Sequence, residues 1–99
     1  MGEYWVSHKR MNTDNTRIIK VKAMERRKGS GLSSAEEYDR EEVIQSIEND
    51  NNWFTCLQKD KRVWTKKAEI HIIQVGKNKF IITDRNQTEA DNLGELPDF

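Results

Sequence analysis

The sequence contains one cysteine, Cys56, which excludes an internal disulfide as a source of stability. Its place inside the strand-like stretch WFTCLQ predicts an inert thiol that is buried or half-buried. The chain also lacks any apolar run close to the roughly 20 residues that a membrane-spanning helix needs. Its first residues show neither the basic nor the apolar region of a signal peptide. We therefore expect a cytoplasmic protein with no membrane partner.

Catalytic and cofactor signatures are missing as well. No nucleophile elbow, phosphate-binding loop or Gly-rich dinucleotide turn occurs in the chain. His8 and His71 stand far apart and have no Cys or His at metal-ligand spacing. The polar segment 84–91 lacks the central glycine of a calcium loop. We therefore expect no enzymatic activity, no metal site and no cofactor.

What the chain does contain is enough for a small core. Hydrophobic and charged residues are equally frequent, at 34% each, and the net charge is zero. Three Trp, three Phe and two Tyr provide large apolar side chains, which favours a folded chain over a disordered one. We expect residues 1–99 to form one domain. Its ends at 1–3 and 98–99 should be frayed, and the Gly- and Ser-rich segment 26–37 should be a flexible loop.

Zero net charge conceals an alternation of basic and acidic blocks. Residues 1–32 carry eight Lys or Arg against three Asp or Glu, and residues 51–83 carry seven against two. Residues 33–50 carry one against seven, and residues 84–99 carry one against five. Opposite blocks usually complement each other within one molecule. The alternative is a basic sheet face that meets a phosphate-bearing ligand.

The hydrophobic periodicity predicts strands on both sides of one helix. Strand-like runs begin at Tyr4 and Thr16 and are separated by the turn residues NTDN. Further strands are expected from Trp53, over the long run 63–75 and from Phe80. This order predicts an α+β fold, in which a small antiparallel sheet, ββαβββ in sequence, carries one helix on one face.

One segment has clear helix signals. Asp39 stands in the N-cap position and Glu42 follows three residues later, which is the spacing of a capping box. Val43, Ile44 and Ile47 then fall on one apolar stripe. We expect this stripe to face the sheet.

The helix EEVIQSIEND, the strand FIITD and the closing segment NLGELPDF resemble an uncharacterised bacterial family, domain-of-unknown-function family 3892. Its members typically end in the motif Asn-Leu-x-x-Leu-Pro, which this chain matches at Asn92, Leu93, Leu96 and Pro97. The resemblance runs from about residue 16 to Phe99. It implies a small stand-alone bacterial or phage domain without an agreed activity.

Apolar residues return at the end of the chain after a polar loop. Leu93 and Leu96, together with Pro97, are expected to form a clasp that closes an open end of the core. Burial of two Leu side chains would contribute roughly 3–6 kcal/mol, a large share of the about 5–15 kcal/mol that stabilises a small domain. The alternative is an exposed hook for a partner. We expect Pro97 to end the ordered chain, with Asp98 and Phe99 looser.

One set of residues is a candidate ligand site. If the strands pair as predicted, the face opposite the helix carries the set Lys20, Lys22, Thr65, Lys67 and His71. Basic side chains beside rings such as Tyr4 or Trp5 hold single-stranded nucleic acid or nucleotides, because charges contact phosphates and rings stack on bases. The alternative is a solvated face whose lysines protect sheet edges, and Glu69 in the same row favours it.

Two functional hypotheses remain. The first is a non-catalytic binding or interaction module that acts on a protein partner or self-associates as a dimer, through a sheet face, an edge strand or the tail. The second is a binder of nucleic acid or of a phosphorylated small molecule, as a phage accessory protein would be, which uses the basic sheet face.

Overall fold

β-Strands dominate the protein. In the computed structural model 62% of the described residues lie in strands. The structure describes residues 2–14, 16–27, 29, 31–60, 63–83, 91, 93 and 96–99. In chain order the elements are β1 (Glu3–Met11), β2 (Ile18–Arg27), β3 (Gly31–Leu32), β4 (Glu36–Asp39), α1 (Arg40–Glu48), β5 (Asn52–Asp60), β6 (Val63–Glu69), β7 (His71–Val75) and β8 (Asn78–Ile82).

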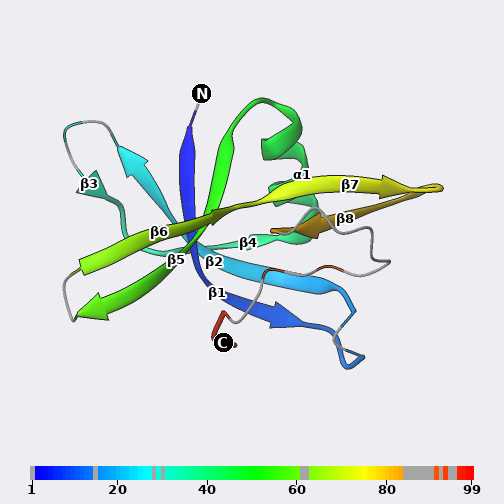
Figure 1. Ribbon diagram of the computed structural model, residues 1–99, viewed down its shortest axis with the longest axis horizontal. Helices are drawn as coiled ribbons and strands as arrows, with labels where there is room; N and C mark the ends of the chain where they lie inside the picture. Colours follow the sequence, from blue (N-terminus) through cyan, green and yellow to red (C-terminus); the bar gives the residue numbers. More distant parts are fainter. Residues whose placement is uncertain are drawn as a thin grey trace.

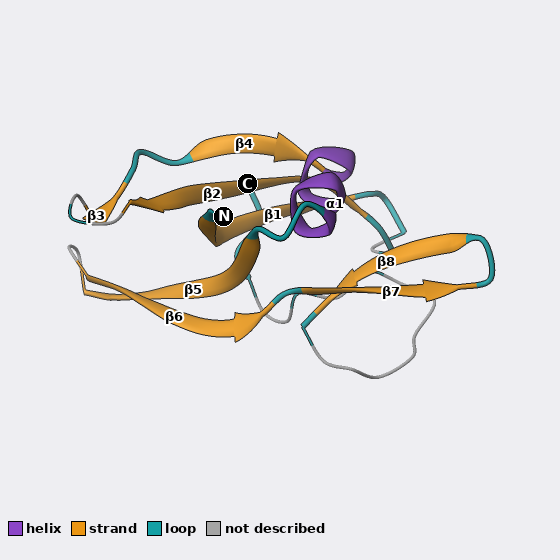
Figure 2. Ribbon diagram, turned by 90° about the horizontal axis from the view of Figure 1, so that it is seen from above, coloured by secondary structure: helices purple, strands orange, loops and turns teal. Residues whose placement is uncertain are grey.

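The strands form one curled sheet and one separate hairpin (Figure 1). In the sheet the order is β3, β2, β1, β5 and β6, and β4 also pairs with β2. The hairpin consists of β7 and β8. Seen from above, the sheet bends into a half barrel, and α1 lies at the end where the hairpin begins (Figure 2).

The expected α+β fold with an antiparallel sheet was wrong. The protein is mainly β, and its sheet is a half barrel in which β1 and β5 run parallel, with Tyr4 opposite Trp53. The expected loop at 26–37 contains the end of β2, all of β3 and the start of β4, and both short strands fold back onto β2. Because these strands take one edge of β2 and β1 takes the other, β5 pairs with the remaining edge of β1.

The run from residue 63 to residue 75 forms two strands instead of the single long strand expected. β6 pairs with β5 as far as Glu69, and β7 then pairs with β8 from His71 onward. Ile70 lies between them, only 3% exposed, and its N–H donates to the Trp53 carbonyl at 2.8 Å. The chain therefore turns away from the sheet where Ile70 enters the core.

α1 confirms the helix predicted from the sequence. The Asp39 carboxylate accepts a hydrogen bond from the Glu42 N–H at 2.8 Å, and the Glu42 carboxylate accepts one from the Asp39 N–H at 3.3 Å. Val43 and Ile44 are buried, and Ile47 packs against the same core. The capping box fixes where the helix begins, and the apolar stripe fixes which side faces the sheet.

The main core lies between α1, the sheet and the hairpin. Its buried residues are Val6, Ile18, Val21, Ala23, Val43, Ile44, Trp53, Ile70, Ile81 and Leu93. At its edge the Tyr4 ring stacks on Trp53 with centroids 4.5 Å apart, and Tyr38 meets Trp53 edge-on at 5.4 Å. Burial and the neighbouring Glu36 carboxylate raise the pKa of Tyr38 to about 12. These rings join β1, β4 and β5 into one aromatic cluster.

The chain after residue 90 is called the tail, and its inner part, of which residues 91, 93 and 96 are described, enters the main core. Leu93 is 4% exposed, and Leu96 packs partly buried against the same cluster. Both positions lie where the clasp prediction requires them. Asn92, the first residue of the closing motif, lies outside the described residues.

The outer part of the tail, residues 97–99, pairs with β1. The Lys9 N–H donates to the Pro97 carbonyl at 2.9 Å, and the Phe99 N–H donates to the Lys9 carbonyl at 3.1 Å. Asp98 thereby forms a parallel bridge with Lys9, beyond the point where β5 leaves β1. Asp98 and Phe99, which we expected to be loose, are therefore held by main-chain hydrogen bonds.

A buried ion pair joins the tail to three other elements. The Asp91 side chain is 0% exposed, and its carboxylate accepts from Arg40 Nε at 2.8 Å. It also accepts from the N–H groups of Ile18 and Ile81, both at 2.8 Å. The hydrogen bond to Asp91 raises the pKa of Arg40, whose guanidinium also donates to the Lys79 carbonyl. Asp91 thus connects the start of β2, the strand β8 and the first turn of α1.

Deletion of residues 92–99 should lower the midpoint of thermal unfolding by many degrees. The deletion removes Leu93 and Leu96 from the core, and each kcal/mol lost is worth roughly 4–8 °C in a domain of this size. Calorimetry of the truncated and full-length proteins measures the difference. A truncated protein that melts with the full-length one would show that the tail is not a clasp and would favour the hook.

Asp91→Asn should cost about 3–5 kcal/mol of unfolding free energy, because it leaves the Arg40 charge without its partner in a buried site. Urea unfolding measures the loss. Asp98→Asn is the matched control, since its side chain is 78% exposed and its contact with Lys9 is worth less than about 1 kcal/mol. Similar small losses in both variants would contradict the role assigned to Asp91.

Candidate functional site

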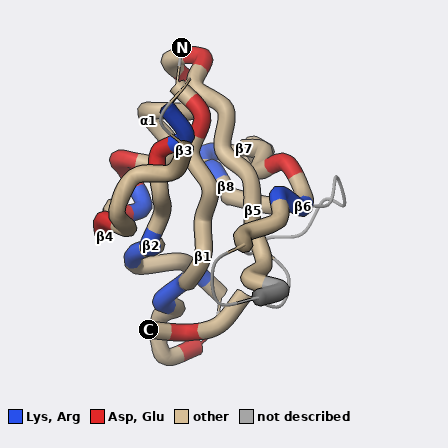
Figure 3. Tube along the Cα trace, turned by 90° about the vertical axis from the view of Figure 1, so that its left-hand side faces the viewer, with Lys and Arg blue, Asp and Glu red and all other residues tan. Residues whose placement is uncertain are grey.

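The sheet face that lacks the helix carries two adjacent rows of side chains, and both are rich in cations. The row on β2 consists of Lys20, Lys22, Met24 and Arg26, which alternate with core residues. Their direct cross-strand partners on β1 are Arg10, His8, Trp5 and Glu3. Directly paired residues point to the same side of a sheet, so these side chains share one surface. Figure 3 shows the Lys and Arg positions that recur along β2.

We call this surface the basic-aromatic face. It is defined by its cations and its rings, which are Arg10, Lys20, Lys22, Arg26 and Lys66 with Trp5, Phe54 and Phe99. Lys66 and Phe54 belong to β6 and β5, and Phe99 belongs to the tail. The face therefore draws on both ends of the chain and on its middle.

Two of the cross-strand pairs bring basic groups opposite each other. Arg10 lies opposite Lys20, and His8 lies opposite Lys22. Arg10 and Lys20 carry like charges, and like charges in a direct cross-strand pair destabilise a sheet. On the other edge of β2 the direct partners of Lys20 and Lys22 are acidic, Asp39 and Glu37, and the Glu37 carboxylate lies 3.8 Å from the Lys20 ammonium. These carboxylates offset part of the repulsion. A row of side chains that lowers the stability of the fold is typical of a surface that binds anions.

An irregularity in β1 aligns His8 with this row. The register with β2 shifts between Val6 and His8, so Ser7 has no direct partner on β2. Ser7 is 3% exposed, and its hydroxyl lies 2.8 Å from His8 Nδ1. Because this hydroxyl is buried, the contact orients the His8 ring and does not present a nucleophile to a substrate.

The rings on this face lie beneath cations. The Lys66 ammonium is 4.3 Å from the centre of the Phe54 ring, and the Arg26 guanidinium is 5.5 Å from the Trp5 ring. Both distances fall within the about 6 Å over which a ring face attracts a cation. Basic and aromatic groups therefore contact each other directly on this surface.

Curling of the sheet forms a cleft at one end of the face. Its volume is about 530 Å³, and β3 and β6 approach each other across it. Its lining residues are Trp5, Met24, Arg26, Gly31, Leu32, Ser33, Val63 and Trp64. A second, smaller core of Trp5, Met24 and Cys56 underlies the cleft, and Trp64 and Phe54 pack partly buried against it. The cleft offers an apolar surface next to the cations.

The structure divides the ligand set that the sequence predicted. Lys20 and Lys22 lie on the basic-aromatic face. Thr65 and Lys67 alternate with Lys66 along β6, so their side chains leave the strand on its other side. The expectation that these residues share one face was therefore wrong.

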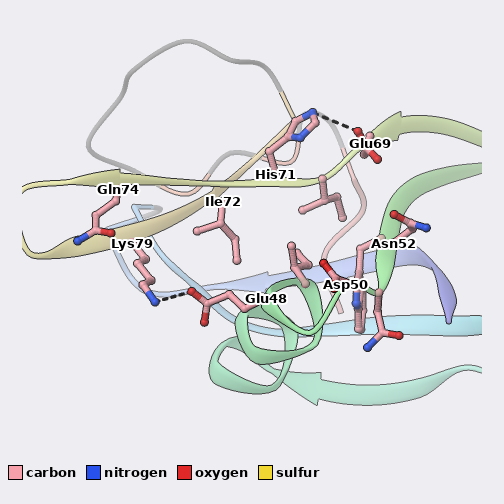
Figure 4. A pocket seen from close by; sticks show the side chains of 12 residues that line it. Glu48, Asp50, Asn52, Glu69, His71, Ile72, Gln74 and Lys79 are labelled. Atoms are coloured by element: carbon pink, nitrogen blue, oxygen red, sulfur yellow. Dashed lines mark hydrogen bonds and ion pairs between the residues drawn. The ribbon is translucent and has the colours of Figure 1, made fainter. Parts of the chain in front are cut away.

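His71 is separated further, because the chain turns at Ile70. It lines a different pocket, of about 620 Å³, between the end of α1 and β7 (Figure 4). The Lys79 ammonium lies 2.5 Å from the Glu48 carboxylate, and His71 Nε2 lies 3.7 Å from the Glu69 carboxylate. Asp50 also lines the pocket, so three carboxylates lie there with one lysine and one histidine. This pocket is therefore acidic and does not favour a phosphate-bearing ligand.

Sequence reasoning missed most of the face. The residues not foreseen were Arg10, Arg26, Lys66, Phe54 and Phe99. Alternation along IIKVKAMERR could have found Arg26, since it follows Lys20 and Lys22 at even spacing. The other four depend on pairings between distant segments, for which the sequence carries no local signal.

Among the described residues, no group of three or more His, Cys, Asp or Glu side chains is arranged to hold a metal ion. None of the described segments forms a helix with the length and apolarity that crossing a bilayer requires. The basic-aromatic face is therefore the arrangement with the clearest chemical character.

Cys56 should react with thiol reagents far more slowly in the folded protein than in the unfolded one. Its Sγ lies 3.3 Å from the Val6 carbonyl, and burial raises the pKa of the thiol to about 11. Near neutral pH the folded protein then holds about 300-fold less thiolate than an unfolded chain, whose thiol has a pKa of about 8.5. Labelling rates with and without urea measure the difference, and equal rates would contradict it.

Comparison with known proteins gives a family and no function. Residues 5–97 match the family described as protein of unknown function (DUF3892). The match begins within β1 and so includes N-terminal residues that the resemblance seen from about residue 16 left out. Neither the curated proteins nor the solved structures gave a match. Because the match covers nearly the whole chain, the protein belongs to DUF3892, a family of proteins of unknown function.

Proposed function

We propose that the protein is a non-catalytic binding module whose ligand is a single-stranded nucleic acid held across the basic-aromatic face. The observation that supports this most is the direct pairing of Arg10 with Lys20, with Lys22 two residues along on the same sheet surface. A pair of like charges weakens a sheet. Phosphate groups placed between the cations would replace repulsion by attraction and would release counterions from the nucleic acid.

The aromatic residues supply the second half of the recognition. Stacking of a base on an aromatic ring contributes about 1–3 kcal/mol and is largely independent of base identity. Phe54 and Trp64 are partly buried, so the smaller core holds each ring while part of it stays accessible. The Lys66 side chain over Phe54 is long and flexible. A base can displace the Lys66 side chain from the Phe54 ring, and the Lys66 ammonium group then moves to a phosphate.

The shape of the face favours an extended strand over a single nucleotide. From Trp5 to Arg10, β1 advances about 17 Å at about 3.3 Å per residue. The cleft beside Trp64 lies at one end and Arg10 lies at the other. Rings beside the cleft and cations along β1 and β2 match a chain in which bases and phosphates alternate.

A protein partner or a second copy of the chain has weaker support. β6 is the last strand in the described order of the sheet, so its outer edge has no strand beside it there. Lys66 and Lys67 stand in the middle of this strand. Antiparallel pairing of two copies along the whole strand would bring these lysines together, and lysines on an edge typically prevent such association. A bacterial or phage origin, which the family resemblance implies, and a cytoplasmic location, which the single cysteine favours, are part of the proposal.

A labelled single-stranded oligonucleotide of mixed sequence should bind with strongly salt-dependent affinity. Each phosphate contact contributes about −0.7 to the slope of log K against log salt concentration. Replacing Lys20 and Lys22 together by Ala should therefore weaken binding at low salt and reduce the magnitude of the slope by about 1.4. Fluorescence anisotropy over a salt series measures both quantities.

The matched control is the double variant Lys67→Ala with Lys77→Ala, which removes the same charge from exposed positions outside the face. It should leave the slope unchanged. Equal weakening by the two double variants would show attraction to overall charge and would contradict a site. A complete absence of salt-sensitive binding at low ionic strength would refute the proposal. A duplex of the same sequence should bind less tightly, because its bases are not free to stack.

A further inference from the structure

The outer tail, residues 97–99, pairs with the edge of β1, and Phe99 reaches the basic-aromatic face. Arg10 Nε donates to the backbone oxygen of Phe99 at 2.9 Å, and the same guanidinium lies 4.6 Å from the centre of the Phe99 ring. The Lys22 ammonium lies 5.0 Å from that ring. The Asp98 carboxylate lies 4.0 Å from the Lys9 ammonium on the other side of β1, since Lys9 pairs with the core residue Val21. On the face itself, one aromatic ring and one backbone oxygen contact two cations.

These contacts have the chemistry of a bound nucleotide. A nucleobase offers a flat ring that a guanidinium or an ammonium can cover, as Arg10 and Lys22 cover Phe99. A phosphate offers oxygens that accept from arginine, as the Phe99 backbone oxygen does from Arg10. The outer tail therefore supplies within the molecule the two kinds of group that the proposed ligand would bring.

The outer tail is attached less firmly than the inner tail. Leu93 is buried in the main core and Leu96 packs against it. Pro97 and Asp98 are exposed, and no residue of the outer tail belongs to either core cluster. Two main-chain hydrogen bonds join it to Lys9. It can therefore leave the face without opening the core.

We infer that the outer tail occupies a nucleotide subsite of the basic-aromatic face and is displaced when a nucleic acid binds there. The inference rests on the proposed function and adds the regulation of that site. Arg10 and Lys22 cannot cover a base while they cover Phe99, so tail and ligand compete. If the tail covers the subsite nine-tenths of the time, it reduces the apparent affinity by about tenfold.

Phe99→Ala in the full-length chain tests this competition. The variant should bind a single-stranded oligonucleotide up to about tenfold more tightly than the wild type at the same salt concentration. Its thermal midpoint should change little, because the ring lies outside both cores. Phe99→Trp is the matched control, since it keeps an aromatic ring for the same cations and should bind like the wild type. Anisotropy titrations and calorimetry measure the two properties.

The outcomes separate the inference from the proposed function. Weaker binding by Phe99→Ala would make the ring part of the binding platform, and unchanged binding would show that the tail does not compete. Either result overturns the inference and leaves the proposed function intact. If neither the wild type nor the variant shows salt-sensitive binding, both the inference and the proposed function are overturned. With fluorinated phenylalanine at position 99, a resonance that moves to its unfolded-peptide position on addition of oligonucleotide would support displacement directly.

Discussion

The buried Asp91 carboxylate is the contact on which the arrangement of the other elements depends. A single side chain from the tail accepts hydrogen bonds from the start of β2, from β8 and from the guanidinium in the first turn of α1. A buried charge that lacked these donors would cost several kcal/mol, so the elements reach their positions together or not at all. This explains how the β7–β8 hairpin, which shares no described ladder with the curled sheet, is fixed against it. It also places the tail, and through the tail the contacts of Phe99.

Local structure could be read from the sequence, and pairing across the chain could not. The capping box at Asp39 and the alternation along β2 depend on residues a few positions apart, and both were foreseen. The parallel pairing of β1 with β5, the return of β3 and β4 onto β2, and the turn at Ile70 depend on contacts between distant residues. An α+β fold with an antiparallel sheet followed from assuming that every strand pairs with its neighbours in the chain. Most strands do, but β1 pairs in parallel with β5 and β4 pairs with β2.

The same limit decided how much of the candidate site could be foreseen. Lys20 and Lys22 were identified because two residues of one strand share a face by simple alternation. The β6 and β7 residues of the predicted set were grouped with them by assuming one straight strand from residue 63 to residue 75. The register shift beside Ser7 and the position of the tail then completed a different surface, with Arg10 at the end that meets the tail. Neither feature leaves a trace in the local pattern of residues.

The tail contributes to the stability of the core and also covers part of the proposed binding surface. Its inner residues contribute Asp91 and Leu93 to buried contacts, while its outer residues lie over cations that repel each other. A row of paired cations lowers the stability of a bare sheet, and the ring and oxygen of Phe99 offset part of that cost in the free protein. Under the proposed function the phosphates and bases of a nucleic acid would offset the repulsion between the same cations. The exchange of one set of contacts for the other would leave the core unchanged, because the cations are held on β1 and β2 whether the tail or a ligand covers them.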